Sequence, residues 1–173
     1  ICGLLLQSGN DCAAAIAEHI SGSQEAFAEL MNTEAKQLGA TGTHFVNPHG
    51  LHDENHYTTT YDLYLMFNEA LKDQAFLDII SMNSYTAKVT SADGTSYTPT
   101  WQATNYYSAG EATPPDGIHV YGGKTGTTDQ AGNCVILYEK NTAGEPYISV
   151  IMGASDKPLL YEEMNELLDA GMK

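Results

Sequence analysis

A short run in the second half of the chain combines one lysine with three glycines and three threonines. It reads Tyr-Gly-Gly-Lys-Thr-Gly-Thr-Thr over residues 121–128, and apolar residues on both sides predict a β-strand. The bare positions Gly122, Gly123 and Gly126 would let an extended peptide pair with the strand edge. Lys124 supplies a cation, and Thr125 and Thr127 supply hydroxyls and backbone donors. This combination suits a peptide that ends in a free carboxylate.

A purely structural explanation of the same run is also available, since a glycine-rich turn beside a solvated lysine is common. A phosphate-binding P-loop is excluded, because the upstream glycine of that motif is missing and strand-like sequence follows.

A second candidate, Ser8-Gly9-Asn10, lies before a predicted helix over residues 12–20. Gly9 interrupts an apolar run, and Asn10 or Asp11 is a suitable N-cap, so the tripeptide has an ordinary explanation as a turn and a cap. A catalytic Ser8 would have to face a cleft.

Composition restricts the possible partners. The 173 residues carry a net charge of −15, which argues against binding of nucleic acid or an anionic membrane surface. All seven basic residues are lysines, so any carboxylate must be bound by lysine, histidine, hydroxyls or backbone N–H groups. The three cysteines, at positions 2, 12 and 134, have no zinc-like spacing and are expected to be small core residues. No cofactor motif is present.

The pattern along the chain predicts an α+β architecture. Residues 1–82 are expected to form a mainly helical lobe, with helices at 24–38 (after a capping box formed by Ser21 and Gln24), 60–72 and 74–81. Residues 83–173 are expected to form antiparallel strands and a terminal helix. They comprise a hairpin (85–90 and 95–100), a long loop (101–117), strands at 119–128, 134–139 and 147–153, and a helix from Pro158 that buries Leu159, Leu160, Met164, Leu167 and Leu168.

The strand at 147–153 is apolar enough for a central position, so we expect a neighbouring strand to be missing. The exposed edge could then pair with another copy of the chain.

The two tripeptides together match two of the three motifs of penicillin-binding proteins and related β-lactamases. The segments 43–51 (Thr-His-Phe-Val-Asn-Pro-His-Gly-Leu) and 123–128 (Gly-Lys-Thr-Gly-Thr-Thr) resemble D-alanyl-D-alanine carboxypeptidases of low molecular mass. The resemblance extends over about residues 4–154 in the right order, and it implies a β-lactamase/transpeptidase-like fold.

The resemblance implies a cofactor-independent serine peptidase of the cell envelope, outside the cytoplasm. Such an enzyme removes the terminal D-alanine from peptidoglycan stem peptides through an acyl-enzyme and reacts with β-lactam antibiotics. By this resemblance Ser8 would relay protons and Asn10 would bind the substrate amide and the lysine of the nucleophile motif. Lys124, Thr125 and Gly126 would bind the substrate carboxylate, and the Thr127 N–H would contribute to the oxyanion hole.

One departure from the family pattern is serious, because the chain contains no Ser-x-x-Lys. Residues 33–36 place a lysine three positions after a threonine, so they have the spacing of the motif without its serine. Ser84 and Lys88 are four positions apart, one more than the motif requires. We therefore expect the nucleophile upstream of Ile1, the chain to be the C-terminal part of a catalytic domain, and the chain alone to be inactive. The abrupt apolar start at residues 1–6 favours the same view. Lys157 is the one basic residue at a stretch where some relatives carry an arginine.

Three alternatives remain open. His49, His52 and His56 could bind zinc, although their spacing fits no hydrolase signature. The groove could bind peptides or peptidoglycan without catalysis. A β-lactamase is less favoured, because no glutamate matches the deacylating residue of the class A enzymes.

Overall fold

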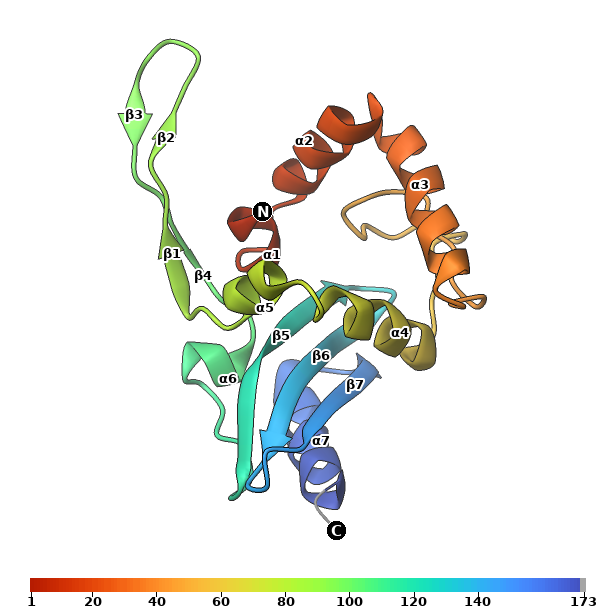
Figure 1. Ribbon diagram of the computed structural model, residues 1–173, viewed down its shortest axis with the longest axis vertical. Helices are drawn as coiled ribbons and strands as arrows, with labels where there is room; N and C mark the ends of the chain where they lie inside the picture. Colours follow the sequence, from red (N-terminus) through yellow and green to blue (C-terminus); the bar gives the residue numbers. More distant parts are fainter. Residues whose placement is uncertain (172–173) are drawn as a thin grey trace.

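The computed structural model describes residues 1–171, and its first half is helical. Helices α2 and α3 form an arch that leads down to α4 beside the sheet (Figure 1). The bounds of the first five helices are α1 (Cys2–Leu5), α2 (Asn10–Ser21), α3 (Gln24–Gln37), α4 (Thr60–Ala70) and α5 (Gln74–Ile80).

The second half consists mostly of antiparallel strands, so the predicted α+β class is confirmed. A hairpin of four short strands projects from the body (Figure 1), and the three long strands form the sheet β5-β6-β7. The bounds are β1 (Ser84–Thr86), β2 (Val89–Thr90), β3 (Ser96–Tyr97), β4 (Thr100–Gln102), α6 (Tyr106–Ala109), β5 (Ile118–Thr128), β6 (Gly132–Asn141), β7 (Pro146–Ala154) and α7 (Lys157–Gly171).

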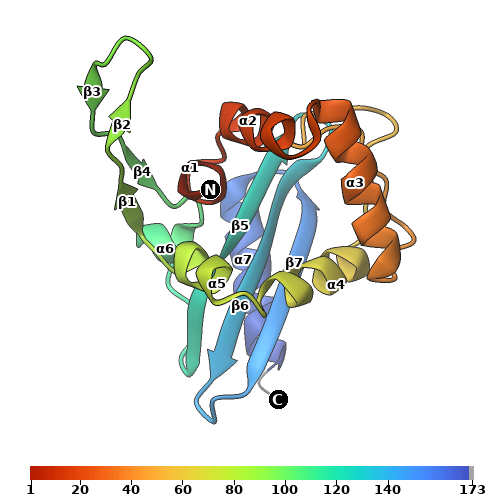
Figure 2. The same cartoon turned by 45° about the horizontal axis from the view of Figure 1, so that its top comes forward.

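The core lies on both faces of the three-stranded sheet because β6 alternates its side chains. Val135 and Leu137 join the cluster under α7, whereas Ile136 joins the cluster with Phe67 of α4 and Ile80 of α5. Figure 2 shows α7 behind the sheet and α4 and α5 in front of it. Strand β5, which carries the lysine motif, is therefore fixed by a sheet with helices on both faces.

Two glycines of β5 are required by close packing. A Cβ atom at Gly122 would collide with the backbone carbonyl of Ile80 at the end of α5, and one at Gly123 would collide with the carbonyl of Ile136 on β6. A register shift between Val120 and Gly122 accompanies this approach. Glycine is needed here so that α5 can pack directly on the strand.

Several expectations about helix ends are wrong. The N-cap of α3 is Ser23, whose hydroxyl accepts from Ala26 N at 3.1 Å, whereas Ser21 is the last residue of α2. The N-cap of α2 is Gly9, without a side-chain hydrogen bond, so neither Asn10 nor Asp11 caps that helix. Neighbouring polar residues offer several possible caps, and the turn geometry selects among them.

Burial also differs from expectation at some sites. Leu167 of α7 was expected to be buried but is 42% exposed, whereas Tyr161 of the same helix is buried and was not expected to be. The cysteines are free and only partly buried. Strand β7 is an edge of the sheet within residues 1–171, which agrees with the expectation that a neighbouring strand is missing from this chain. Over the same residues, no helix is long and apolar enough to cross a membrane.

A buried carboxyl group lies between the sheet and α7. Glu139 of β6 is 1% exposed; its Oε1 accepts a hydrogen bond from Ser149 Oγ at 2.6 Å, and its Oε2 has no partner among the described residues. Burial raises the pKa of Glu139 to about 7, and the Ser149 hydrogen bond opposes this rise. The carboxyl group is therefore protonated in weakly acidic solution.

The first prediction concerns Gly122. We expect Gly122→Ala to lower the free energy of unfolding by about 2–3 kcal/mol, because α5 must move away from β5. The matched control is Gly126→Ala on the same strand, where a Cβ meets no atom within 4 Å and the change should be small. Urea unfolding of both variants measures the difference. Equal effects of the two substitutions would contradict this account.

The second prediction concerns pH. The folded-state pKa of Glu139 lies above the ordinary value of 4.5, so its ionisation favours the unfolded chain. Stability is full below about pH 4.5 and falls by up to about 3 kcal/mol as the pH rises to about 7. Glu139→Gln should remove this part of the pH dependence, as measured by urea unfolding at pH 5 and pH 8. If the difference in unfolding free energy between pH 5 and pH 8 is the same in Glu139→Gln as in the unchanged protein, ionisation of Glu139 does not destabilise the fold.

Candidate active site

Ser8 lies in the turn between α1 and α2 in an uncommon backbone conformation. Its φ of 55° makes it the one residue other than glycine with positive φ among the described residues. The turn is held by a hydrogen bond from Gly9 N to Gly3 O at 3.1 Å. A left-handed serine costs about 1–3 kcal/mol and persists only where its surroundings enforce it, which is frequent at functional sites.

Lys124 of β5 points towards this turn. Its Nζ donates hydrogen bonds to Ser8 Oγ and, at 2.6 Å, to the carbonyl oxygen of Thr125. No carboxylate forms an ion pair with it within residues 1–171. Burial lowers the pKa of Lys124 to about 8, because the charged ammonium loses hydration without gaining a counter-ion. The ammonium group is thus poised to bind an anion.

A groove of about 510 Å³ joins the two predicted motifs. Strand β5 contributes one wall, and Ser8 and Asn10 contribute another. The loop after Pro48 contributes a third wall. The residues lining it are Leu4, Ser8, Asn10, His49, Gly50, Leu51, Thr104, Lys124, Thr125, Gly126, Thr127, Thr128 and Lys157. All six predicted site residues therefore line one groove, although up to 119 positions separate them in the sequence.

The individual side chains of the groove differ in how firmly they are held. Asn10 is exposed at the first position of α2 and has no side-chain hydrogen-bond partner among residues 1–171. Thr127 is also exposed, and its hydroxyl donates to Asn133 Oδ1 at 3.3 Å. Asn10 and the backbone near Thr127 are therefore accessible to a bound molecule.

Thr104 is a groove residue that the sequence analysis did not identify. Thr104 Oγ1 lies 2.6 Å from Thr125 Oγ1, in hydrogen-bond contact, and so fixes the threonine next to Lys124. The long loop over residues 101–117 was the available signal, but nothing in it distinguished Thr104. His49, considered above for zinc, lines the groove with its loop. Lys157 also lines it and lies 5.3 Å from the ring centre of Tyr106.

We expected three glycines without side chains to leave the edge of this strand open to a peptide, and this expectation is wrong for two of them. Gly122 and Gly123 are buried by α5 and β6, so they present nothing to a ligand. Gly126 alone is exposed and faces open space. The accessible part of the strand therefore begins at Lys124.

Histidines of the loop over residues 44–57 form hydrogen bonds to the loop's own backbone. His44 Nδ1 is 2.6 Å from Asn55 O, His56 Nδ1 accepts from Val46 N at 3.2 Å, and His49 Nδ1 accepts from Leu51 N at 3.2 Å. Burial lowers the pKa of His56. Among the described residues, no group of three or more histidine, cysteine or acidic side chains is placed to hold a metal ion.

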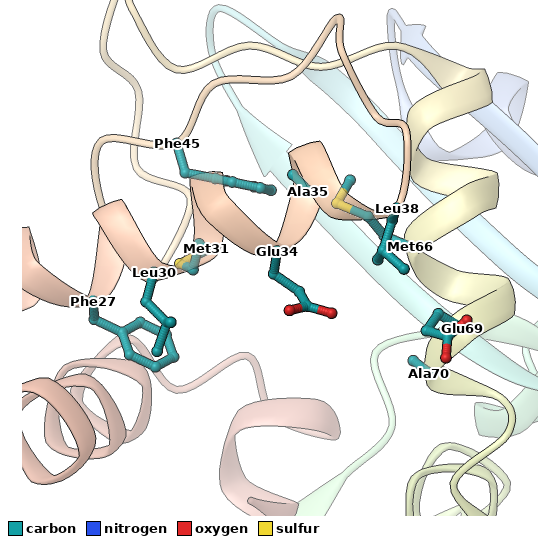
Figure 3. A pocket seen from close by; sticks show the side chains of 10 residues that line it. All are labelled: Phe27, Leu30, Met31, Glu34, Ala35, Leu38, Phe45, Met66, Glu69 and Ala70. Carbon is teal, nitrogen blue, oxygen red and sulfur yellow. The ribbon is translucent and has the colours of Figure 1, made fainter.

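A second hollow, also of about 510 Å³, lies between α3 and α4 (Figure 3). Its walls are almost entirely apolar, with Phe27, Met31, Phe45 and Met66 among them. Glu34 and Glu69 supply its only titratable groups, and no serine, cysteine or lysine lines it. The groove at Lys124 is therefore the better candidate for chemistry.

The neighbouring tyrosines of the long loop pack in the core rather than line the groove. Tyr106 stacks on Tyr161 with ring centres 4.5 Å apart, and Tyr107 OH donates to Asn165 Oδ1 at 2.8 Å.

Comparison with known proteins identifies relatives over nearly the whole chain. A family model described as D-alanyl-D-alanine carboxypeptidase matches residues 1–156. The D-alanyl-D-alanine carboxypeptidase DacF of Bacillus subtilis is 32% identical over 96% of this chain, and DacA of Haemophilus influenzae is 32% identical over 98%. This chain spans about 40% of the length of each of these two relatives.

Solved structures show the same fold. A mutant of the DD-transpeptidase of Streptomyces K15 superposes with a TM-score of 0.89 at 26% identity, covering 99% of this chain and 66% of that one. A D-alanyl-D-alanine carboxypeptidase of Mycobacterium tuberculosis superposes with a TM-score of 0.81 at 27% identity, covering 99% and 62%. The expected β-lactamase/transpeptidase-like fold is thereby confirmed.

The third prediction concerns the ammonium group of the groove. In an NMR titration of lysine labelled at Cε, Lys124 should titrate with a midpoint of about 8, and the signal is assigned by its loss in Lys124→Met. Ser8→Ala should lower this pKa further, because the charged form loses one hydrogen-bond acceptor. A midpoint near 10.5 would show that Lys124 is solvated.

Proposed function

This chain belongs to the D-alanyl-D-alanine carboxypeptidase family, and we propose that it supplies the substrate-binding half of a serine-type D-alanyl-D-alanine carboxypeptidase. The contact between Ser8 and Lys124 carries the proposal, because it joins two motifs 116 residues apart in one groove. The substrate is a peptidoglycan stem peptide ending in D-alanyl-D-alanine. The protein then acts at the cell envelope, outside the cytoplasm.

Lys124 is the natural partner of the substrate carboxylate. It is the partly buried cation of the groove, and Thr125 beside it is oriented by Thr104. Below about pH 8 it carries the charge that a carboxylate requires. The neighbouring positions Gly126 and Thr127 offer accessible backbone to the rest of the peptide, in the manner of an added strand.

Ser8 and Asn10 act at the scissile bond. The Oγ of a nucleophilic serine attacks the carbonyl carbon of the penultimate D-alanine, and the peptide N–H of the Thr127 region stabilises the oxyanion. Ser8 passes the serine proton to the departing amine of the terminal D-alanine, and Asn10 holds the substrate amide. Water then hydrolyses the ester, releasing the shortened peptide and restoring the serine.

The nucleophilic serine must come from outside these 173 residues, since they contain no Ser-x-x-Lys. The same absence favours a second candidate function for the chain by itself, namely peptide binding without catalysis. The two functions use the same groove and differ in whether a covalent intermediate forms.

The fourth prediction separates them by intact mass after incubation with benzylpenicillin. We expect the chain extended upstream of Ile1 to gain one covalent acyl group, whereas the 173-residue chain gains none. In the extended form, Lys124→Met should slow acylation by roughly 100- to 1,000-fold, because the penicillin carboxylate loses its cation.

The control is Lys36→Met on the exposed side of α3, which should acylate at the normal rate. An extended chain that stays unmodified would overturn the catalytic proposal and leave the binding function. An adduct on the short chain would reveal a nucleophile within it.

A further inference from the structure

The base of the projecting hairpin (residues 84–102) packs against the first helix of the chain. Trp101 of β4 lies against Gly3 of α1, because a Cβ atom added at Gly3 would be 3.3 Å from both Cε2 and Cζ2 of the indole ring. Tyr85, the cross-strand partner of Trp101 on β1, stacks on the same indole with ring centres 6.2 Å apart. The indole is therefore held within the hairpin and contacts α1 at a glycine.

A second side chain packs closely on the same glycine. The Cβ atom added at Gly3 would lie 2.8 Å from Cys12 Sγ of α2, which is closer than real side chains approach. Gly3 is buried, so its backbone cannot move away into solvent. The position of Gly3 is therefore set jointly by the indole of Trp101 and the thiol of Cys12.

Gly3 in turn holds the turn that carries Ser8. Its carbonyl oxygen accepts a hydrogen bond from Gly9 N at 3.1 Å, across the turn between α1 and α2. The hairpin also reaches this turn through its last residue, since Gln102 N donates to Gln7 Oε1 at 3.4 Å. Strand β4 therefore supports the segment around Ser8 at two points.

The backbone conformation of Ser8 requires support from outside the turn. A φ of 55° in a residue other than glycine costs about 1–3 kcal/mol, and it persists only where the surrounding structure enforces it. Helix α1 cannot enforce it alone, because a helix of four residues is not stable by itself. An indole ring packed on α1 supplies a large apolar contact that fixes the helix.

We propose that Trp101 is a positioning residue for Ser8. The indole ring holds Gly3 in place, and the Gly3 carbonyl holds Gly9 N. The turn fixed in this way directs Ser8 Oγ towards Lys124 Nζ. Trp101 lies outside the set of described residues that line the groove, so it acts without touching a bound peptide. Its consequence for catalysis rests on the proposed function, whereas its effect on the turn does not.

The fifth prediction concerns the hydrogen bond from Gly9 to Gly3 in the 173-residue chain. We expect Trp101→Ala to speed hydrogen–deuterium exchange of the Gly9 amide by at least about tenfold, because the bond opens more often when Gly3 loses its support. Amides of the central strand β6 should change by a smaller factor. NMR-detected exchange measures both, and it thereby separates a local opening of the turn from a general loss of stability.

The matched control is Tyr97→Ser in the same hairpin. It removes an aromatic ring that is 52% exposed on β3, and Figures 1 and 2 show β3 standing clear of the other elements of the body. The Gly9 amide should therefore exchange at the normal rate in Tyr97→Ser.

Penicillin acylation of the chain extended upstream of Ile1 tests the consequence for Ser8. Trp101→Ala should lower the acylation rate constant by about tenfold, since Ser8 is no longer held at the reacting atoms. The dissociation constant of the initial non-covalent complex should stay within about twofold, because Lys124 is untouched. Tyr97→Ser should change neither quantity.

A second pair of variants leaves the indole in place. Gly3→Ala introduces a methyl group that meets Cys12 Sγ, so it should speed Gly9 exchange and slow acylation in the same way. Combining it with Cys12→Ala removes the sulfur atom, and both rates should return to within about threefold of those of the unchanged protein. A general loss of stability would instead grow with the second substitution.

The inference fails if Trp101→Ala and Tyr97→Ser have equal effects on Gly9 exchange. It also fails if Gly3→Ala leaves that exchange unchanged, or if an extended chain that is acylated keeps its acylation rate constant in Trp101→Ala. An extended chain that is not acylated at all would contradict the proposed function, and the exchange of the Gly9 amide would still decide this inference.

Discussion

The site depends on one unusual interaction, an ammonium group held out of water with no carboxylate beside it. Lys124 has only neutral oxygens as partners, those of Ser8 and Thr125, and its lowered pKa records the loss of hydration. A counter-ion within the protein would remove this cost and occupy the position where the proposed function places the substrate carboxylate. The strained turn at Ser8 and the hydroxyl pair of Thr104 and Thr125 both fix the surroundings of this ammonium group.

Maintaining that site requires a rigid strand. Strand β5 is paired with β6 along ten residue positions and is pressed by α5 at Gly122, where no other residue fits. The core clusters under α7 and under α4 and α5 fix the sheet from both faces. The lysine thus lies within a strand that is paired and packed on both sides of it along the chain, and its position does not depend on a loop.

Much of this could be predicted from the sequence. The periodicity located the helices, hairpin and long strands, and the family resemblance identified the six groove residues and the fold. The contact between Ser8 and Lys124 could not be deduced locally, because it depends on how the helical lobe packs on the sheet. The sequence also could not distinguish the roles of the glycines, because these depend on tertiary contacts. Gly122 and Gly123 allow close packing of the backbone, whereas Gly126 leaves the strand accessible from the groove.

Other features were missed because they depend on neighbours distant in the sequence. The choice of Ser23 over Ser21 as a cap follows from where the turn after α2 ends, at Gly22 with a φ of 80°. The raised pKa of Glu139 follows from its burial beneath α7, and alternation along β6 places it there among apolar neighbours. Thr104 could not be identified because it lies in a predicted loop that has no recognisable sequence motif.

The charge of the chain limits how a substrate can be attracted. A net charge of −15 repels an anionic peptide at long range, although salt screens this beyond about 8 Å under physiological conditions. Recognition of a carboxylate would therefore depend on short-range contacts, which the groove at Lys124 offers. Under the proposed function, Lys124 would neutralise one carboxylate in the groove, since no carboxylate of the described residues pairs with it. By the same proposal, a single partly buried cation in an acidic protein would give specificity for one carboxylate, because the overall charge keeps other anions away.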